Sequence, residues 1–385
     1  MQSVEYKGII EQIRKLGECL KDGEFIESPF DVPVEEERRG DPDQRDDDLN
    51  FPQGENICVS LEPTLPQSKK RIDSVSYRHR LIYFLDGSLR TKYLGDYIEG
   101  ERSFPILASE VSCAVVKREG RLLRPCKVDK RLVFIFPHKN TGLISDTTYE
   151  KLEELNRQWE EANSFLRIDF LRKERQEIRD VRYSMLGKAR DIMHSLEHEV
   201  AESLDRGDDW LVMDGAIRKE EFLKLDNTIG LAKSFSRKPI FDLGDGRPLM
   251  ITTYLSRVRN GERSAVFRVY KKKKNNDDLT PLKIAFWYVR LRTYPPMEPL
   301  GGLVKIDFRL DEEELSQETI RLIDEISAEI YALRSPSVYP HPRWPSFIYP
   351  IRLTEEIMHS MHINKEIIGY YGRELKRIIG GVRYA

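Results

Sequence analysis

The amino-acid sequence predicts a mixed α/β fold in which helices cover both faces of a β-sheet. Two observations indicate this class. Apolar runs rich in aromatic and β-branched residues recur along the chain, and segments with apolar residues at helical spacing lie between and after them. The 385 residues suffice for one domain of about 300 residues with an appended arm. We therefore expect an N-terminal arm over residues 1–75 and one domain over residues 76–385.

The arm is expected to be less regular than the domain. Apolar residues at helical spacing predict a short amphipathic helix over 4–20. Residues 24–68 are rich in proline and charge, which indicates a solvated connection with one short strand at 57–61. This arm is a candidate docking surface for a partner protein.

The domain elements follow from local composition. The segment 146–204 is almost free of glycine and proline and rich in Glu, Arg, Leu and Lys, which predicts one long helix. Later segments with helical spacing predict helices over 311–334 and 353–377. Strands are predicted in the apolar runs at 78–88, 106–120, 131–137, 210–217, 264–270 and 282–294.

The charge balance limits how the protein can bind a polyanion such as a nucleic acid. Lysine and arginine total 63 against 65 acidic residues, so the formal net charge is -2. This excludes nucleic-acid binding through bulk positive charge and requires a local patch. The preferred phosphate-binding tract is 118–131, where few acids are close in the sequence. Its basic residues are Arg118, Arg121, Arg124, Lys127, Lys130 and Arg131.

The cellular setting is expected to be the cytoplasm. The four cysteines form no CxxC pair, which predicts reduced thiols rather than a zinc cage or a disulfide framework. No apolar run approaches the roughly 20 residues of a membrane-spanning helix. The N-terminus has no apolar signal segment.

Two apolar strands each run into an Asp-Gly pair, at Asp86 and Asp214. Asp-Gly is a common hairpin turn. An aspartate at the carboxyl end of a central strand also lies where α/β sheets hold their ligands, and the paired occurrence favours this interpretation. On the predicted long helix, Glu197 and Glu199 flank the apolar stripe and can reach the sheet. Three converging carboxylates suit magnesium or manganese, which activate water for phosphodiester hydrolysis.

At this point the chain resembles a known family. The segments LDGS at 85–88, LVMDG at 211–215, IGLAKSF at 229–235 and FIYPIRL at 347–353, together with the helical glutamate, are similar in order and spacing to the NurA nucleases. These are partners of the HerA hexameric translocase. The resemblance implies an RNase H-like core, a homodimer, and manganese-dependent DNA cleavage in a prokaryotic cytoplasm. It also implies work with a HerA-type ATPase in DNA end processing or defence against foreign DNA.

The resemblance carries over to individual residues. It implies that Asp86, Glu197 and Asp214 bind one or two Mn²⁺ or Mg²⁺ ions, with Glu199 as the alternative helical ligand. It also implies that Lys233 is a cation near the scissile phosphate.

The C-terminal part of the pattern is incomplete. The family tyrosine matches Tyr349, but the histidine that follows it would fall near Ile357. The nearest histidines are His359 and His362, and we take His359 as the substitute. The missing histidine also fits an alternative, a NurA-like subunit that regulates the motor without cutting DNA.

A second motif competes for the same glutamate. Residues 194–198 fit H-x-x-E-H, the inverted zinc-protease signature, with His194 and His198 on one helix face. Because both interpretations use Glu197, a zinc protease and the metal nuclease exclude each other.

Overall fold

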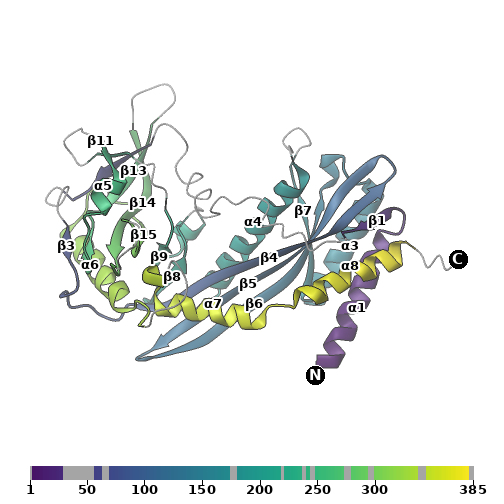
Figure 1. Ribbon diagram of the computed structural model, residues 1–385, viewed down its shortest axis with the longest axis horizontal. Coiled ribbons are helices and arrows are strands. Elements are labelled where there is room, and N and C mark those ends of the chain that lie inside the picture. The colour runs from purple at the N-terminus through teal and green to yellow at the C-terminus, as the bar shows by residue number, and fades with distance from the viewer. Residues whose placement is uncertain are drawn as a thin grey trace.

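The computed structural model describes residues 2–28, 56–62, 69–173, 180–217, 221–235, 240–242, 248–272, 279–293, 299–336 and 344–380. It confirms the mixed α/β class, with one large sheet flanked by helices (Figure 1). The strands are β1 Glu24–Glu27, β2 Asn56–Ser60, β3 Lys70–Arg71, β4 Leu81–Glu99, β5 Arg102–Glu119, β6 Leu122–Pro137, β7 Leu166–Leu171, β8 Trp210–Asp214, β9 Thr228–Ala232, β10 Ile240–Asp242, β11 Pro248–Met250, β12 Glu262–Arg263, β13 Phe267–Lys272, β14 Leu279–Arg290 and β15 Leu303–Arg309. The α-helices are α1 Gln2–Cys19, α3 Asp146–Glu161, α4 Val181–Glu202, α5 Ile251–Leu255, α6 Gln317–Ala332, α7 Tyr349–Met361 and α8 Lys365–Ile379.

The sheet joins a long antiparallel ribbon to a central parallel part. Its main path is β11-β10-β2-β13-β14-β15-β9-β8-β4-β5-β6-β7. Strands β4, β5 and β6 form the ribbon and have 19, 18 and 16 residues. At the centre, β8 lies between β4 and β9 and is parallel to both. The short strand β8 therefore ends beside the first third of β4, next to Leu85.

The predicted strand end at Asp86 is wrong. Strand β4 continues through Asp86 and Gly87 without a turn and pairs with β5 along its length. The second Asp-Gly pair behaves as predicted, since β8 ends at Asp214 and Gly215 has a positive φ of 96°. A glycine adopts this conformation without the steric cost that a side chain would bring.

The predicted helix over 146–204 is also wrong in its middle. Helix α3 ends at Glu161, Asn163 turns the chain with a φ of 48°, and β7 then pairs in parallel with β6. The Asn163 conformation is one in which asparagine is enriched. Helix α4 begins only after Asp180, whose side chain accepts a hydrogen bond from the Tyr183 N–H. Strand β15 is a further element that the sequence did not predict.

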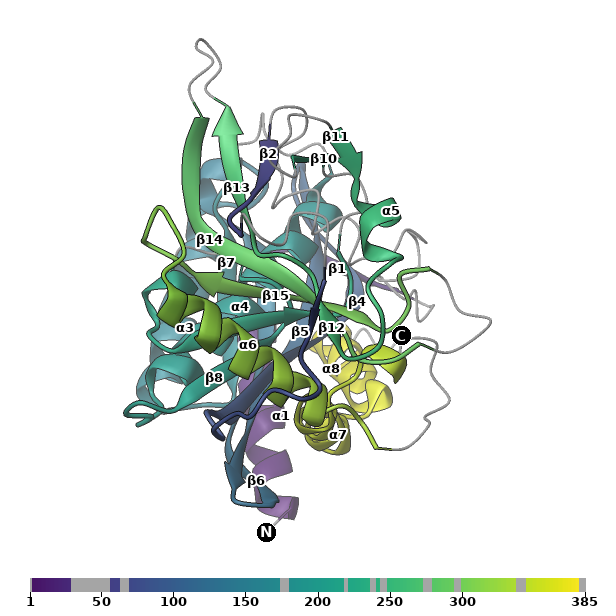
Figure 2. The same cartoon turned by 90° about the vertical axis from the view of Figure 1, so that its left-hand side faces the viewer.

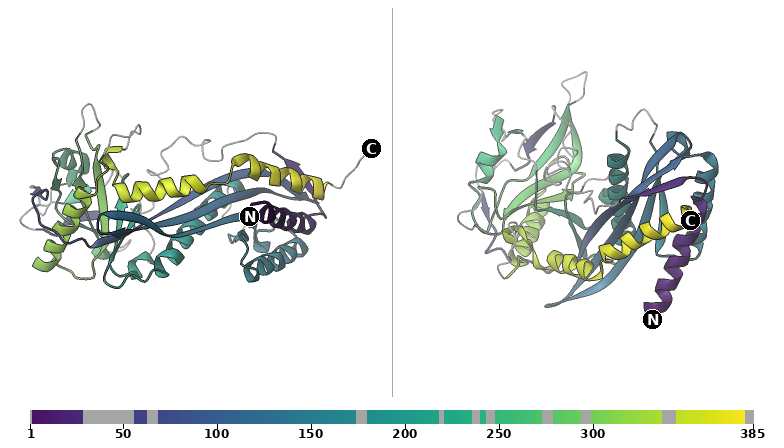
Figure 3. Two further views of the ribbon diagram at one scale, coloured as in Figure 1. Left: turned by 90° about the horizontal axis from the view of Figure 1, so that it is seen from below. Right: turned by 45° about the vertical axis from the view of Figure 1, so that its right-hand side comes forward.

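Helices cover the two faces of the central sheet with different partners. On one face, α4 packs with alternate strand residues such as Leu85 and Leu211 in one apolar cluster. On the other face, α6 and the start of α7 pack against the strand residues that alternate with these, including Phe84 of β4 and Val212 of β8. Figure 2 presents the end of the molecule that carries α6, and Figure 3 shows α7 and α8 along one side of the ribbon, with α4 on the other side. The alternation of side chains along β4 thus separates an α4 face from an α7 face.

The described parts of the N-terminal 75 residues are built into this sheet. Strand β1 pairs with β4, β2 with β13, and β3 with β12. Helix α1, which confirms the predicted N-terminal helix, packs with α3 and α8 around a shared apolar core. Buried Glu62 accepts hydrogen bonds of 2.7 Å from two nitrogens of Arg263. Residues 29–55 and 63–68, which include most of the predicted charged connection, lie outside the described residues.

Candidate metal centre

Strand register places two aspartates side by side. Leu85 of β4 pairs in parallel with Met213 of β8, so the next residues, Asp86 and Asp214, share the α7 face of the sheet. Asp86 is buried, with 8% of its surface exposed, whereas Asp214 is partly exposed. The two Asp-Gly pairs found in the sequence therefore meet in space.

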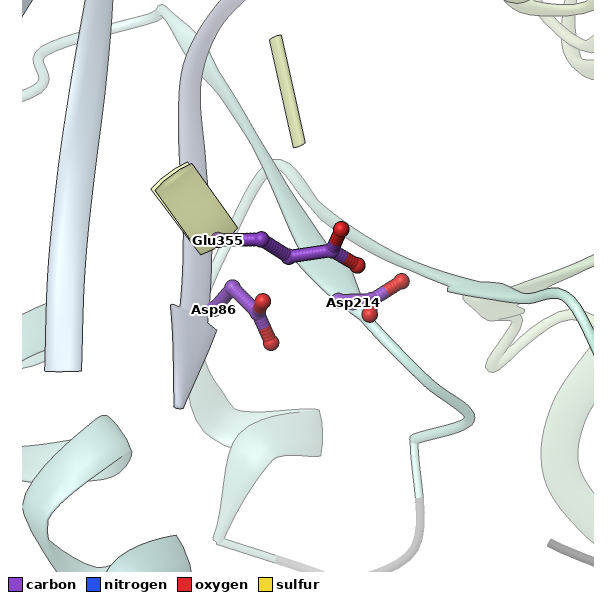
Figure 4. Close-up of side chains that lie close together, drawn as sticks. All are labelled: Asp86, Asp214 and Glu355. Atoms are coloured by element: carbon purple, nitrogen blue, oxygen red, sulfur yellow. The ribbon is translucent and has the colours of Figure 1, made fainter. Parts of the chain in front are cut away.

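The third carboxylate comes from α7 and was missed by sequence reasoning. Glu355 extends from α7 toward Asp86 and Asp214 (Figure 4), and each of the three residues offers an oxygen within 4.8 Å of the other two. Ile351 and Met358 of the same helix are buried and hold it to the protein. A glutamate on an amphipathic helix carries no distinctive sequence signal.

Lys233 contacts two of the three carboxylates. Its Nζ donates hydrogen bonds to Asp214 Oδ2 at 3.0 Å and to Glu355 Oε1 at 2.6 Å. The ammonium also lies 5.0 Å from the centroid of the Phe347 ring, and 9% of the side chain is exposed. The sequence prediction of a functional cation at this position therefore coincides with a lysine that bridges two of the three carboxylates.

The site is short of positive charge for its number of acids. Burial raises the pKa of Asp86 well above its ordinary value, and the neighbouring charges of Asp214 and Glu355 raise it further, against the opposing effect of Lys233. Burial alone would lower the pKa of Lys233, but these three carboxylates raise it above its ordinary value. A buried aspartate that resists ionisation, grouped with two further carboxylates, is chemically suited to a divalent cation with oxygen ligands.

The predicted helical ligand Glu197 lies on the α4 face instead. A Cβ placed on Gly87 would be 2.4 Å from Glu197 Oε1, so this glutamate packs against the strand residue next to Asp86. Its other oxygen, Oε2, is 2.8 Å from His194 Nδ1. Glu197 is not among the three carboxylates that group together, although its charge is one of the influences that raise the pKa of Asp86.

The alternative helical ligand is placed elsewhere. Glu199 is exposed and accepts a hydrogen bond of 2.6 Å from Arg131 of β6. It therefore faces the ribbon at a distance from the carboxylate group.

The two histidines of the H-x-x-E-H motif do not converge on a metal position. His194 contacts Glu197, while His198 Nδ1 is 3.5 Å from Glu202 Oε2. Among the residues that the structure describes, the one group of three or more possible metal ligands is Asp86, Asp214 and Glu355. The motif is explained by helix contacts, and the zinc-protease interpretation gains no support.

The end of α7 is held to the ribbon by a buried polar cluster. The buried Glu110 of β5 is 2.7 Å from Lys130 Nζ and accepts a hydrogen bond of 2.9 Å from the Ile363 N–H. His362 lies between Glu110 Oε2 at 3.6 Å and Ser88 Oγ at 3.5 Å. This cluster fixes the end of the helix that carries the third carboxylate.

The predicted C-terminal site residues flank α7. Tyr349 is its first residue, and 43% of its surface is exposed. His359 is exposed one helical turn beyond Glu355, with its ring centroid 5.1 Å from that of His362. Catalytic roles for Tyr349 and His359 stay predictions.

The predicted phosphate tract forms the tip of the β5–β6 hairpin and residues 122–131 of β6. In space it is less free of acids than in the sequence, because carboxylates arrive from other elements. Arg118 is 2.8 Å from Glu329 of α6, and Arg131 is 2.6 Å from Glu199 of α4. Lys127 contacts Ser203 at the end of α4, whereas Arg121 is exposed at the tip.

The fold and this site define a mixed α/β protein with a group of three carboxylates and a lysine at the meeting point of parallel strands. A model of the NurA domain matches residues 80–342, and the chain belongs to the NurA family. The matched segment contains Asp86, Glu197, Asp214 and Lys233, whereas Glu355 lies beyond it. The resemblance seen in the sequence is thereby confirmed.

Solved structures give two further matches. The crystal structure of the NurA nuclease from Sulfolobus solfataricus matches with 11% identity and a TM-score of 0.42, covering 80% of this chain and 87% of that one. Endonuclease V from Ciona intestinalis, in complex with an inosine-containing DNA, matches with 11% identity and a TM-score of 0.29, covering 77% and 93%. No curated protein sequence matches the chain.

Proposed function

We propose that this protein is a metal-dependent deoxyribonuclease that hydrolyses phosphodiester bonds with water as the nucleophile. Membership in the NurA family supports a nuclease. The observation that carries the metal dependence is the convergence of Asp86, Asp214 and Glu355 within 4.8 Å beside Lys233. Such a group has no need of a protein nucleophile, because a bound dication can supply the activated water.

Each side chain of the group has a defined task in this proposal. A bound cation supplies Lewis acidity and lowers the pKa of its water. Asp86, Asp214 and Glu355 hold that cation, and the burial of Asp86 limits competing bulk water. The Lys233 ammonium offers positive charge to the phosphate oxygens on which negative charge develops.

The ligand chemistry favours a hard cation. All three ligands are carboxylates, which suit Mg²⁺ and Mn²⁺ better than the softer zinc. We propose Mn²⁺ as the working ion, as the family implies, with Mg²⁺ as the substitute. Glu197 stays a proposed ligand only if its carboxylate moves around Gly87 when the ion binds.

Partners are proposed from family membership. The protein is expected to act as a homodimer with a HerA-type hexameric ATPase, in DNA end processing or defence against foreign DNA in a prokaryotic cytoplasm. Arg121 and Arg124, the most exposed cations of the hairpin tip, are the proposed contacts to DNA phosphates. Co-purification with a HerA-type ATPase and sizing of the protein alone test both partner proposals.

The decisive experiment is nucleotide release from linear double-stranded and single-stranded DNA, with Mn²⁺ and with chelator. We expect Mn²⁺-dependent release by the wild type and none above background by Asp86→Asn. Glu356→Gln serves as the matched control, since Glu356 is the exposed neighbour of Glu355 and pairs with Arg352. Equal, background-level release by all three proteins would refute the nuclease proposal and favour the motor-regulating subunit.

A further inference from the structure

Lys233 places one positive charge between two of the three carboxylates. Its Nζ sits between Asp214 Oδ2 at 3.0 Å and Glu355 Oε1 at 2.6 Å, so one cation bridges two carboxylates. In two-ion sites, the metals lie about 3.5–4 Å apart and share the surrounding carboxylates. The ammonium of Lys233 therefore already fills one of the bridging positions that such a site would need.

Displacing this ammonium would be unfavourable. The Lys233 side chain is 9% exposed, and its Nζ lies over the Phe347 ring. A second dication between Asp214 and Glu355 would separate a buried ammonium from both of its partners. Removing a partner from a buried charge is strongly destabilising, because water does not replace it.

The charge of the group matches one dication. When Asp86, Asp214 and Glu355 are ionised, they contribute three negative charges, and Lys233 contributes one positive charge. The remaining two negative charges equal the charge of one Mn²⁺ ion. The fourth nearby acid, Glu197, packs against Gly87 on the α4 face and is engaged by His194.

We propose that this centre binds a single divalent cation and that the Lys233 ammonium takes the place of a second one. Asp86, Asp214 and Glu355 would hold the ion. This inference rests on the metal centre of the proposed function and narrows it from one or two ions to one. Lys233 then acts as a fixed internal cation that sets the metal stoichiometry.

Metal binding to the full-length protein tests the inference without any measurement of cleavage. Mn²⁺ alone is the probe, with binding followed by calorimetry and by the electron paramagnetic resonance signal of free Mn²⁺. We expect one bound ion per chain in the wild type and in Lys233→Arg, which keeps the positive charge. We expect two bound ions in Lys233→Met, which keeps the apolar stem and removes the charge.

The outcomes separate this inference from the proposed function. Two ions per wild-type chain would overturn the inference while leaving a metal nuclease intact, and this result needs no variant to fold. One ion in a folded Lys233→Met protein would overturn the role of Lys233. A wild type that binds no Mn²⁺ would overturn the metal centre itself, and the proposed function with it.

Discussion

The two faces of β4 at Asp86 and Gly87 carry different acidic groups. On the α7 face, Asp86 meets two further carboxylates and a lysine. On the α4 face, Gly87 makes room for Glu197, which is held by His194. Adjacent strand residues point to opposite faces of the sheet. Asp86 therefore faces the candidate metal centre, while the next residue, Gly87, faces Glu197. The comparison teaches that Glu197, although close in sequence to Asp214, does not lie on the same face of the sheet.

Removing the central aspartate is expected to give the largest effect. Asp86→Asn should weaken Mn²⁺ binding by at least about 100-fold, because it removes a charged ligand. The raised pKa of Asp86 also predicts a change in stability. Without metal, the ionised carboxyl is disfavoured in the folded state, so its destabilising contribution grows as the pH rises above the ordinary value of 3.8.

Thermal unfolding in chelator, measured across this pH range, checks the stability prediction. Asp86→Asn should unfold at a higher temperature than the wild type at neutral pH, and the difference should shrink on acidification. Adding Mn²⁺ should stabilise the wild type and leave the variant unchanged. A wild type that gains stability relative to Asp86→Asn as the pH rises in chelator would contradict the sign of the shift.

Replacing Glu355 and Glu197 separately by glutamine tests the comparison of the two faces directly. Glu355→Gln should reduce cleavage by about 100-fold or more, as expected for a residue that touches the metal. Glu197→Gln should reduce it by about 10-fold, as expected for a support behind the metal-binding aspartate. Steady-state cleavage and Mn²⁺ affinity are the measurements, with Glu356→Gln as the exposed control. The reverse order would support Glu197 of α4 as the helical ligand, as the sequence predicts.

Two neighbouring basic residues of β6 extend the comparison to stability. Lys130 pairs with fully buried Glu110, whereas Arg131 pairs with exposed Glu199 on the α4 side. Lys130→Met should cost about 3 kcal/mol because it removes the lysine that pairs with a buried carboxylate, which keeps only the Ile363 N–H and His362 beside it. Arg131→Met should cost less than about 1 kcal/mol. Urea unfolding of the two variants measures both values, and equal costs would mean that Glu110 is not stabilised by Lys130.

A methyl group at Gly87 tests how closely Glu197 must approach. The added Cβ of Gly87→Ala would lie 2.4 Å from Glu197 Oε1, so the glutamate has to move. We expect a loss of about 1–3 kcal/mol from this overpacking and a smaller effect on cleavage than Glu355→Gln. Combining Gly87→Ala with Glu197→Ala should restore most of the stability. If the double variant is no more stable than Gly87→Ala, the clash lies elsewhere.

Two of the three grouped carboxylates, Asp86 and Asp214, were candidates from the sequence because their signals are local. Apolar runs ending in Asp-Gly mark Asp86 and Asp214, and Lys233 follows another buried strand. Which helix supplies the third carboxylate depends on how α4 and α7 are placed on the two faces of the sheet. A single sequence does not show this placement. Glu355 lies two residues before the position where the family histidine was sought, yet nothing in its own neighbourhood distinguishes it from a solvated glutamate.

The main error in the fold has a comparable origin. Residues 166–171 alternate apolar and polar side chains as a strand does, but charged helical segments on both sides dominate the composition. The break was signalled by Asn163 and Ser164, since the Ser164 hydroxyl accepts a hydrogen bond from the Leu166 N–H at 3.0 Å. Its parallel partner β6 is separated from it in the sequence by the whole of helix α3. The strand at 166–171 is therefore recognised only once the sheet pairing is known.

The source of the third carboxylate has a consequence for biosynthesis. Asp86, Asp214 and Lys233 leave the ribosome before Glu355, which follows Lys233 by 122 residues. Until α7 has been made and has packed on the ribbon, two aspartates and a lysine carry a net charge of one negative unit, which attracts a dication only weakly. A nascent or truncated chain without α7 would thus lack one of the three carboxylates of the candidate centre.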